Sequence, residues 1–244
     1  MARLQDKVII ITGAAQGMGA THARLCIEAG AKVVLTDINA EKGQALAQEL
    51  GPRALFIQHD VTCEEDWAAV IKTTQAQFGT INVLVNNAGI TMAKSILELS
   101  LQDYRRILEI NQVSVFLGMR AVIPAMQESK QGSIINISSI NGLVGGAIGY
   151  TDSKFAVRGM SKAAALECAP YGIRVNSVHP GVIATPMIMQ GDTKAAVEAF
   201  AKSIPLKRLA QPEEVSGIIL YLASDDSSYS TGAEFIVDGG LTAQ

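Results

Sequence analysis

The chain has 244 residues, of which 48% are hydrophobic, 18% charged and 5% aromatic, and its formal net charge is −3 at pH 7. This length suits one α/β domain with a large core, and the mixed charges offer no basic stripe for nucleic acid. No apolar run approaches the length of a membrane span, and the first residues lack the apolar core of a signal peptide, so we expect a cytoplasmic protein.

Short β-branched runs alternate with longer amphipathic stretches, a pattern typical of βαβ units and a parallel sheet. The predicted strands are almost continuously hydrophobic, as in sheets that helices cover on both faces. They span Val8–Thr12, Lys32–Thr36, Ala54–Gln58, Val83–Asn86, Ser133–Ile137, Arg174–Val178 and Glu234–Val237. The sequence therefore predicts one domain over residues 1–244, with a doubly wound, Rossmann-like parallel sheet in a three-layer α/β/α arrangement.

Three helix starts are indicated by residues that suit a first helical turn. Thr62 and Glu65 have the spacing of a capping box, as do Ser100 and Asp103. Pro212, followed by two glutamates, suits the first turn of a late helix.

A glycine-rich loop follows the first predicted strand and opens an amphipathic helix. The loop contains Gly13, Gln16, Gly17, Met18 and Gly19. Glycines allow a tight turn and the close approach of a pyrophosphate, which the free N–H groups of a helix N-terminus can bind. The spacing is not that of the standard G-x-G-x-x-G fingerprint, but the strand before the loop and the helix after it favour nucleotide binding over an ordinary turn.

Asp37 ends the second predicted strand, where a carboxylate can accept hydrogen bonds from the adenosine ribose hydroxyls. The alternative is an ordinary cap or turn carboxylate. Ile38 follows it and Gln16 lies in the glycine loop, so neither position supplies a cation for a 2′-phosphate, which Asp37 would also repel. These residues favour NAD over NADP.

Tyr150 and Lys154 are four residues apart, so a helix over Tyr150–Cys168 places both side chains on one face. An ammonium stabilises a neighbouring phenolate, so we expect Lys154 to lower the pKa of Tyr150 and to allow proton exchange near neutral pH. Ser138 and Ser139 close a hydrophobic strand upstream. Together with the glycine loop, these residues predict a nucleotide-dependent redox site.

On these residues the chain resembles the short-chain dehydrogenase/reductase family over nearly its whole length, and within it the bacterial secondary alcohol and hydroxysteroid dehydrogenases. The resemblance implies a catalytic tetrad, which consists of Asn111, Ser139, Tyr150 and Lys154. Besides the glycine loop, Asp37 and the Tyr–Lys pair, it implies cofactor contacts at Ile38, Asp60, Val61, Asn87, Ala88, Gly89, Pro180, Gly181, Ile183 and Thr185. An alternative for Asn111 is that it satisfies a buried backbone group.

The loop before Tyr150 is shorter than the family's usual one, which leaves Ser138 as an alternative to Ser139 for the catalytic serine. The residues that we place around the substrate are mostly apolar and uncharged: Ile90, Ser139, Asn141, Leu143, Tyr150, Val182, Met187 and Ile188. They favour a neutral alcohol or ketone. Residues 184–205 have no clear role in the sheet, and we expect them to form a lid over the substrate.

We therefore expect an oxidoreductase that transfers a hydride between NAD(H) and an apolar secondary alcohol or ketone, with Tyr150 as general acid and base. Two alternatives stay open: a 3-oxoacyl-[acyl-carrier-protein] reductase, against which Asp37 argues, and a non-catalytic NAD-binding sensor or scaffold. Apolar residues on several faces of the Tyr150–Cys168 helix, with the resemblance, imply a homotetramer. No metal is expected, except that the resemblance suggests a cation at the terminal carboxylate of Gln244.

Overall fold

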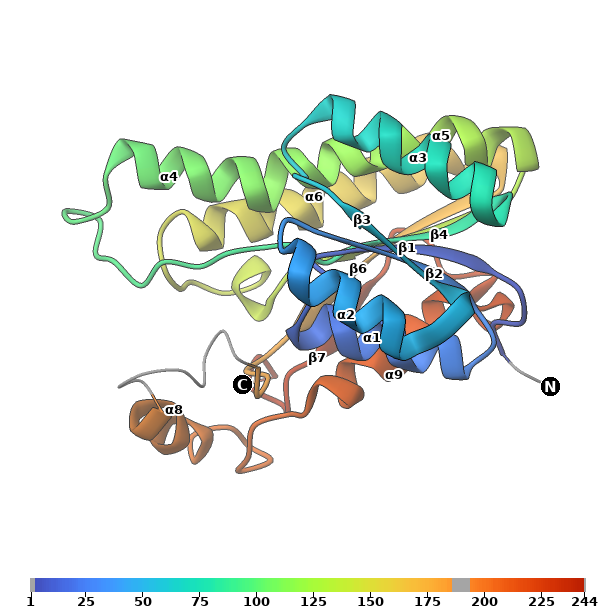
Figure 1. The fold of residues 1–244 in the computed structure, drawn as a ribbon. Helices are drawn as coiled ribbons and strands as arrows, with labels where there is room; N and C mark the ends of the chain where they lie inside the picture. The colour runs from blue at the N-terminus through green and yellow to red at the C-terminus, as the bar shows by residue number, and fades with distance from the viewer. Residues whose placement is uncertain (1–2, 186–193, 244) are drawn as a thin grey trace.

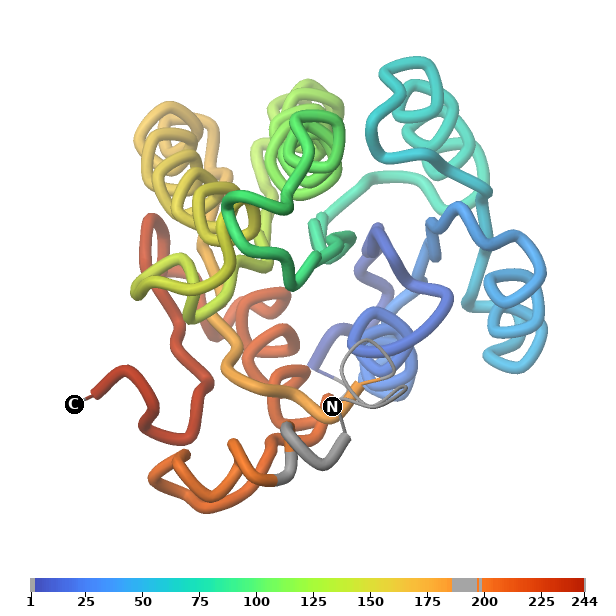
Figure 2. The backbone as a smooth tube through the Cα atoms, turned by 90° about the vertical axis from the view of Figure 1, so that its left-hand side faces the viewer, coloured from blue at the N-terminus to red at the C-terminus, as the bar shows by residue number. Residues whose placement is uncertain are grey.

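The computed structural model describes residues 3–185 and 194–243. A twisted seven-stranded sheet has helices above and below it (Figure 1), and the three layers are visible from the side (Figure 2). The strands are β1 (Val8–Thr12), β2 (Lys32–Asp37), β3 (Ala54–Gln58), β4 (Ile81–Asn86), β5 (Gly132–Ile137), β6 (Ile173–Pro180) and β7 (Glu234–Val237). All pair in parallel in the order β3-β2-β1-β4-β5-β6-β7, which confirms the predicted doubly wound sheet.

Helices cover both faces of the sheet (Figure 2). One face carries α1 (Gly17–Glu28), α2 (Ala40–Leu50) and α9 (Pro212–Ala223), and the other carries α3 (Glu64–Phe78), α5 (Ser114–Ser129) and α6 (Tyr150–Cys168). Helix α4 (Leu101–Leu108) continues into α5 through a π-helical turn, Glu109–Val113, and α8 (Lys194–Ala201) lies at the lower left of Figure 1.

The sheet sits between two hydrophobic cores because alternate residues of each strand point to opposite faces. In β1, Ile9 and Ile11 are buried in the core under α1 and α9, whereas Ile10 is buried in the core under α3, α5 and α6. β2 repeats this pattern, with Val33 in the first core and Val34 in the second. Full burial of each such side chain contributes about 1.5–3 kcal/mol, which is why strands between two helical layers are apolar throughout.

All seven predicted strands form, with small differences at their ends. β4 begins at Ile81, two residues earlier than expected, and β6 continues to Pro180, two residues later. Helix α6 has the predicted bounds.

The predicted helix starts are confirmed at two places and wrong at the third. Ser100 caps α4 and its hydroxyl accepts from the backbone N–H of Asp103 at 3.0 Å, and α9 begins at Pro212. The cap of α3 is Cys63 rather than Thr62, and the Thr62 hydroxyl donates to Asp60 instead, at 2.7 Å. The Thr62 hydroxyl is therefore bonded to the Asp60 carboxylate and does not cap the helix.

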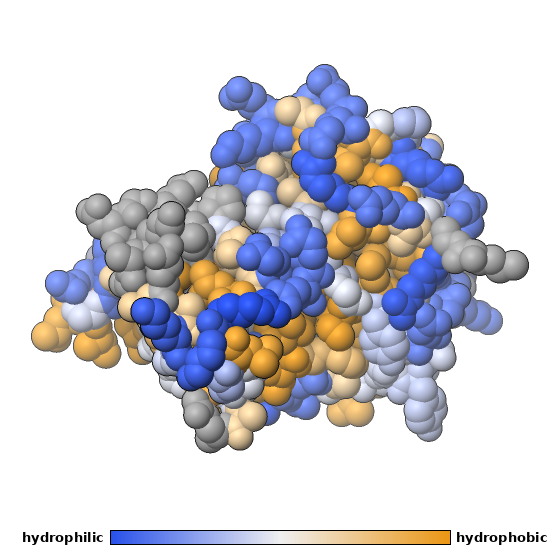
Figure 3. Space-filling model, turned by 90° about the horizontal axis from the view of Figure 1, so that it is seen from below, coloured by the Kyte–Doolittle hydropathy of each residue, from blue (hydrophilic) through white to orange (hydrophobic). Residues whose placement is uncertain are grey.

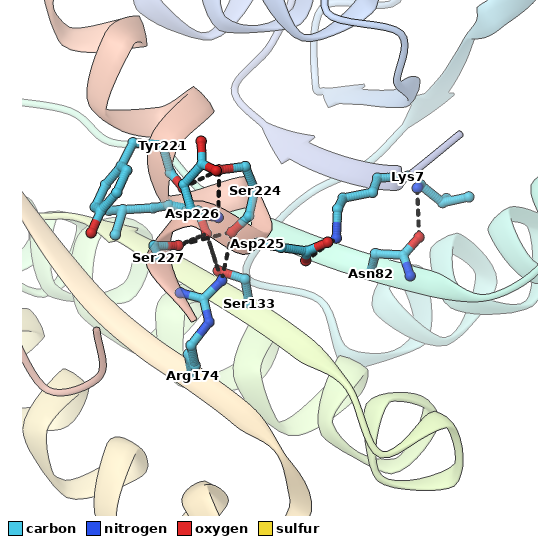
Figure 4. Close-up of polar contacts among 11 residues, drawn as sticks. Lys7, Asn82, Ser133, Arg174, Tyr221, Ser224, Asp225, Asp226 and Ser227 are labelled. Atoms are coloured by element: carbon cyan, nitrogen blue, oxygen red, sulfur yellow. Dashed lines mark hydrogen bonds and ion pairs between the residues drawn. The ribbon is translucent and has the colours of Figure 1, made fainter. Parts of the chain in front are cut away.

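At the amino ends of the strands, polar contacts tie the end of α9 to the sheet (Figure 4). The Arg174 guanidinium donates to the carbonyls of Leu222 and Ser224, at 2.9 and 3.3 Å, and the Ser133 hydroxyl donates to Leu222 at 2.7 Å. Lys7 pairs with Asp225 at 2.7 Å. These bonds close the edge opposite to the one where the glycine loop lies.

One helical run, Leu101–Ser129, has the length and mean hydropathy of a membrane span, but 44% of its most apolar window is buried. Val115, Val122 and Met126 from this run belong to the core under α5. We interpret it as a core helix of the domain.

Candidate active site

The site lies where the strand order reverses. The chain runs from β1 outward to β2 and β3, and then returns to place β4 on the other side of β1, so the loops after β1 and β4 diverge at the carboxyl edge. A cavity of about 560 Å³ opens there. Its lining residues are Gly13, Gln16, Gly17, Met18, Asp37, Ile38, His59, Asp60, Val61, Thr62, Asn87, Ala88, Gly89, Ile90, Arg106, Glu109, Ile110 and Thr185.

Most of the predicted cofactor residues therefore meet at one cavity. Five lining residues were not predicted to lie there: His59, Thr62, Arg106, Glu109 and Ile110. The last three come from α4 and the π-helical turn, and only the tertiary packing of that segment over the carboxyl edge brings them in.

The glycine loop makes a tight turn that residues with a side chain would not tolerate. Gly13 and Gly17 have positive φ angles of 63° and 58°, and a side chain at Gly19 would collide with the carbonyl of Gly13. Helix α1 begins at Gly17, and its N-cap residue Gln16 forms no side-chain cap. The first N–H groups of α1 are thus not capped by the Gln16 side chain and fit a bound anion.

Asp37 is held at the edge of this cavity by two backbone groups. Its carboxylate accepts from the N–H of Ala15 at 3.0 Å and from the N–H of Asn39 at 2.9 Å. Lys42, on α2, donates to the side-chain oxygen of Gln16 at 2.8 Å. Positions 16 and 38 supply no cation themselves, but Lys42 brings one to the glycine loop, because it reaches Gln16 from the first turn of α2.

Asn111 connects the cavity to the Tyr–Lys pair. Its amide oxygen accepts from the N–H of Ile90 and its amide nitrogen donates to the carbonyl of Ile90, both at 2.8 Å. A methyl group at Gly89 would lie 3.3 Å from the Asn111 amide oxygen and 3.6 Å from Nζ of Lys154. Asn111 thus satisfies a buried backbone, as its alternative interpretation had it, and it does so where the cavity meets Lys154.

Tyr150 and Lys154 lie together as α6 predicts, but their protonation differs from the expectation. Nζ of Lys154 is 5.6 Å from the centre of the Tyr150 ring and donates to the carbonyl of Ile137 at 2.8 Å. Burial lowers the pKa of Lys154 to about 8. Burial also raises the pKa of Tyr150, which a hydrogen bond with the Ser139 side chain partly opposes. The pKa of Tyr150 is therefore raised, not lowered as expected, because burial of the phenol has the larger effect.

The two serines have different partners. The Ser138 hydroxyl is buried and donates to the backbone carbonyl of Lys154 at 2.9 Å. The Ser139 hydroxyl accepts from the N–H of Asn141 at 3.1 Å, and the Ser139 side chain lies close enough to Tyr150 to oppose the rise of its pKa. The Asn141 amide donates to the carbonyl of Gly145 at 3.1 Å, within the short loop that contains Leu143. Ser139 is thus the serine that meets Tyr150.

Among the described residues that directly follow β6, 181–185, Thr185 reaches the cavity. Pro180 closes β6, the N–H of Gly181 donates to Val237 at 2.9 Å, and the Ile183 side chain is buried in the core. Thr185 lines the cofactor cavity. Val182 instead lines a second cavity of about 480 Å³ beside β7, away from the cavity at which the glycine loop lies.

Met187, Ile188 and Gln244, which were expected at the substrate and at a terminal cation site, lie outside the described residues. Of the predicted lid, 184–205, the described part includes α8. Within residues 3–185 and 194–243, no three His, Cys, Asp or Glu side chains are close enough to hold a metal ion.

Comparison with known proteins agrees with this geometry. A family model described as enoyl-(acyl carrier protein) reductase matches residues 13–242. The 3-alpha-(or 20-beta)-hydroxysteroid dehydrogenase of Mycobacterium tuberculosis is 51% identical, over 99% of this chain and 91% of the relative. The cyclopentanol dehydrogenase of a Comamonas species is 48% identical over the whole of both chains.

A further relative, the NADP-dependent (R)-specific alcohol dehydrogenase of Lentilactobacillus kefiri, is 43% identical over 99% of both chains. Among solved structures, levodione reductase superposes with a TM-score of 0.93 over 98% of both chains, at 32% identity. The chain is therefore similar in sequence to dehydrogenases of alcohols and hydroxysteroids, and similar in fold to levodione reductase.

Proposed function

We propose a specific reaction for this chain on the premise that it belongs to the short-chain dehydrogenase/reductase family, to which the relatives above assign it. The reaction is hydride transfer between NAD(H) and an apolar secondary alcohol or ketone. Relatives named for hydroxysteroids and for cyclopentanol support an alcohol substrate with an apolar ring. The residues that the sequence places around the substrate, among them Ile90 and Leu143, are mostly uncharged, which supports a neutral substrate.

The proposed cofactor is NAD, which the glycine loop and the N-terminus of α1 would hold through its pyrophosphate. Asp60 and Val61 would hold the adenine, and Asp37 the ribose hydroxyls, since each carboxylate oxygen can accept a second hydrogen bond. The NADP-dependent relative means that the family alone does not decide the cofactor. In this chain the charge of Asp37 at the cavity edge favours NAD, and Lys42 reduces that preference only in part.

The tetrad residues divide the work of proton transfer. A bound nicotinamide supplies or accepts the hydride. The Tyr150 hydroxyl donates its proton to the ketone oxygen in reduction and takes a proton from the alcohol in oxidation. The Ser139 hydroxyl hydrogen-bonds the same substrate oxygen and stabilises the charge that develops there. The ammonium of Lys154 favours the phenolate, and Asn111 fixes the backbone of Ile90 beside them.

The single observation that carries this proposal is the placement of Tyr150 beside Ser139, whose side chain acts to lower its pKa, and beside the buried Lys154, whose Nζ lies 5.6 Å from the ring centre and next to the nucleotide cavity. The test is turnover of aliphatic, cyclic, aryl and steroid alcohols with NAD, for the wild type and for Tyr150→Phe. The variant should lose about 10²–10⁴-fold in kcat while it still binds NADH. Tyr171→Phe, at a half-exposed tyrosine beyond α6, is the matched control.

Retention of more than about a tenth of wild-type kcat by Tyr150→Phe would remove Tyr150 from the mechanism. Turnover of acyl thioesters with NADP, and of no alcohol with NAD, would favour the acyl-carrier-protein reductase alternative. A cellular function that survives Tyr150→Phe would favour the sensor.

The proposed assembly is a homotetramer in the cytoplasm. On α6, Phe155 and Leu166 are 41% and 82% exposed, and Phe116 on α5 is 49% exposed. Seen from below, hydrophobic side chains are also exposed among hydrophilic ones (Figure 3), and Leu206 and Ile236 near the C-terminal segment are 63% and 49% exposed. Closed symmetric pairing is the commonest way to cover such surfaces.

A further inference from the structure

Strand β6 places two buried polar side chains, Ser177 and His179, on one face beside the active site. Nδ1 of His179 is 2.9 Å from the carbonyl oxygen of Ser139, and Nε2 is 2.9 Å from the Ser177 hydroxyl. A carbonyl only accepts, so Nδ1 carries the hydrogen. Nε2 is then bare and accepts from the Ser177 hydroxyl. The two contacts fix one neutral tautomer of His179.

The groups around His179 agree with a neutral ring. Burial lowers the pKa of His179, and the positive charges of Arg158 and Lys154 act in the same direction. The bond to the Ser139 carbonyl and the charge of Glu234 oppose them but do not reverse the shift. At neutral pH the imidazole is therefore a donor at Nδ1 alone.

Ser139 leaves β5 in an extended conformation, with φ −169° and ψ 166°, and several bonds hold it there. Its carbonyl accepts from the N–H of Gly142 at 2.9 Å as well as from His179, and the N–H of Ser138 donates to Val178 at 2.8 Å. The His179 imidazole reaches this peptide from the neighbouring strand. Because the carbonyl and the hydroxyl belong to one residue, a fixed carbonyl limits rotation of the Cα that carries the hydroxyl toward Tyr150.

We propose that His179 is a positioning residue, whose Nδ1–H holds Ser139 in the orientation that meets Tyr150 and the substrate oxygen. His179 is also followed by Pro180 and Gly181, which lead to Thr185 at the cavity, so one side chain joins the Ser139 loop to the strand behind the cofactor site. The inference rests on the proposed function, because that reaction gives Ser139 its task.

Three substitutions of His179 test whether its hydrogen-bond donor at Nδ1 is needed or whether any side chain of similar volume would serve. His179→Asn places an amide nitrogen near the Nδ1 position and can keep the bond to Ser139. His179→Gln places its amide near Nε2 and loses that bond, and His179→Leu removes both polar contacts. We expect the Asn variant to keep at least about a third of wild-type kcat, and the Gln and Leu variants to lose about ten- to a hundredfold, the cost of a misplaced group. KM for NAD should change little in all three.

The matched control is His22, which is also buried and whose Nδ1 lies 2.7 Å from the Ser216 hydroxyl, between α1 and α9. His22→Asn and His22→Gln should not differ in kcat, whatever they do to the melting temperature. NADH binding by fluorescence and the melting temperature are measured for every variant. ¹⁵N NMR of the wild type should show a protonated Nδ1 and a bare Nε2 at His179.

An Asn variant that is no more active than the Gln variant, or a His179 ring protonated at Nε2 alone, overturns the inference while the proposed function stands. A wild type that oxidises none of the alcohols refutes the proposed function, and the role of His179 with it. A rescue by Asn that the melting temperatures do not follow is the expected result, since a purely structural histidine would change both together.

Discussion

Lys154→Met is expected to change how the stability of the cofactor-free protein depends on pH. The Lys154 side chain is 4% exposed, and its ammonium donates to the carbonyl of Ile137 at 2.8 Å. Burial alone accounts for the lowering of its pKa to about 8. The folded protein therefore carries a buried charge at pH 7 that water would stabilise better.

The size and sign of the effect follow from the two pKa values of Lys154. The pKa in the unfolded chain is near 10.5, so the unfolded state binds the proton more tightly between pH 8 and 10.5. The stability of the wild type should thus rise with pH across that window, by about 3 kcal/mol, since a tenfold change in acidity is worth about 1.4 kcal/mol. Methionine does not titrate. The loss of the bond to Ile137 costs about 1–3 kcal/mol at every pH.

The variant should therefore be more stable than the wild type at pH 7, by up to about 2 kcal/mol, and less stable near pH 10, again by up to about 2 kcal/mol. Urea denaturation of the cofactor-free proteins at pH 7, 8, 9 and 10 measures this difference. Lys162→Met is the control, because Lys162 lies on the same helix with its side chain 51% exposed. A difference between Lys154→Met and the wild type that stays constant over this range would refute the reasoning.

Three further predictions concern the serines, the cofactor and the assembly. Ser139→Ala should lower kcat about 10²–10³-fold, as loss of one charge-stabilising donor does, while Ser138→Ala should mainly lower the melting temperature; the reverse order would show that Ser138 is catalytic. Asp37→Ser with Ile38→Arg should shift kcat/KM toward NADP, and equal values for both cofactors in the wild type would contradict the role of Asp37. Light scattering should give four times the chain mass of 25.8 kDa, and Leu166→Glu should lower it; a single wild-type species near 25.8 kDa would exclude the tetramer.

The strands could be predicted because a sheet between two helical layers needs apolar residues on both faces, and this pattern is local. Helix α6 could be predicted for a similar reason, since the Tyr–Lys spacing and the apolar residues that indicate it lie within one continuous segment. The start of α3 could not be predicted from its capping pattern. The Thr62 hydroxyl bonds to the Asp60 carboxylate instead of capping the helix. Which of these two interactions forms depends on the conformation of the loop, and the spacing of residues in a capping box does not specify it.

The position of Val182 depends on contacts between distant segments. Its neighbour Ile183 forms a bridge with Ala210, the carbonyl of Val182 accepts from the N–H of Ala210 at 3.1 Å, and the preceding Gly181 donates to Val237 of β7. The bond between His179 and Ser139 depends on register in the same way. Ile137 pairs with Val178 across β5 and β6, so the residues that follow each of them come together at the carboxyl edge.

The spacing of Tyr150 and Lys154 in the sequence does not show how deeply the two side chains are buried, and burial decides the direction in which their pKa values shift. The sequence contains Tyr150 and Lys154 on one face of a helix, and in water the ammonium would favour the phenolate. In the folded protein both groups are removed from water, which moves both toward their neutral forms: the pKa of Tyr150 rises and that of Lys154 falls. The same low dielectric makes each hydrogen bond in the site electrostatically stronger. The Ser139 side chain, which opposes the shift of the Tyr150 pKa, therefore matters more here than it would at a surface, and so does the His179 side chain that bonds to the Ser139 carbonyl.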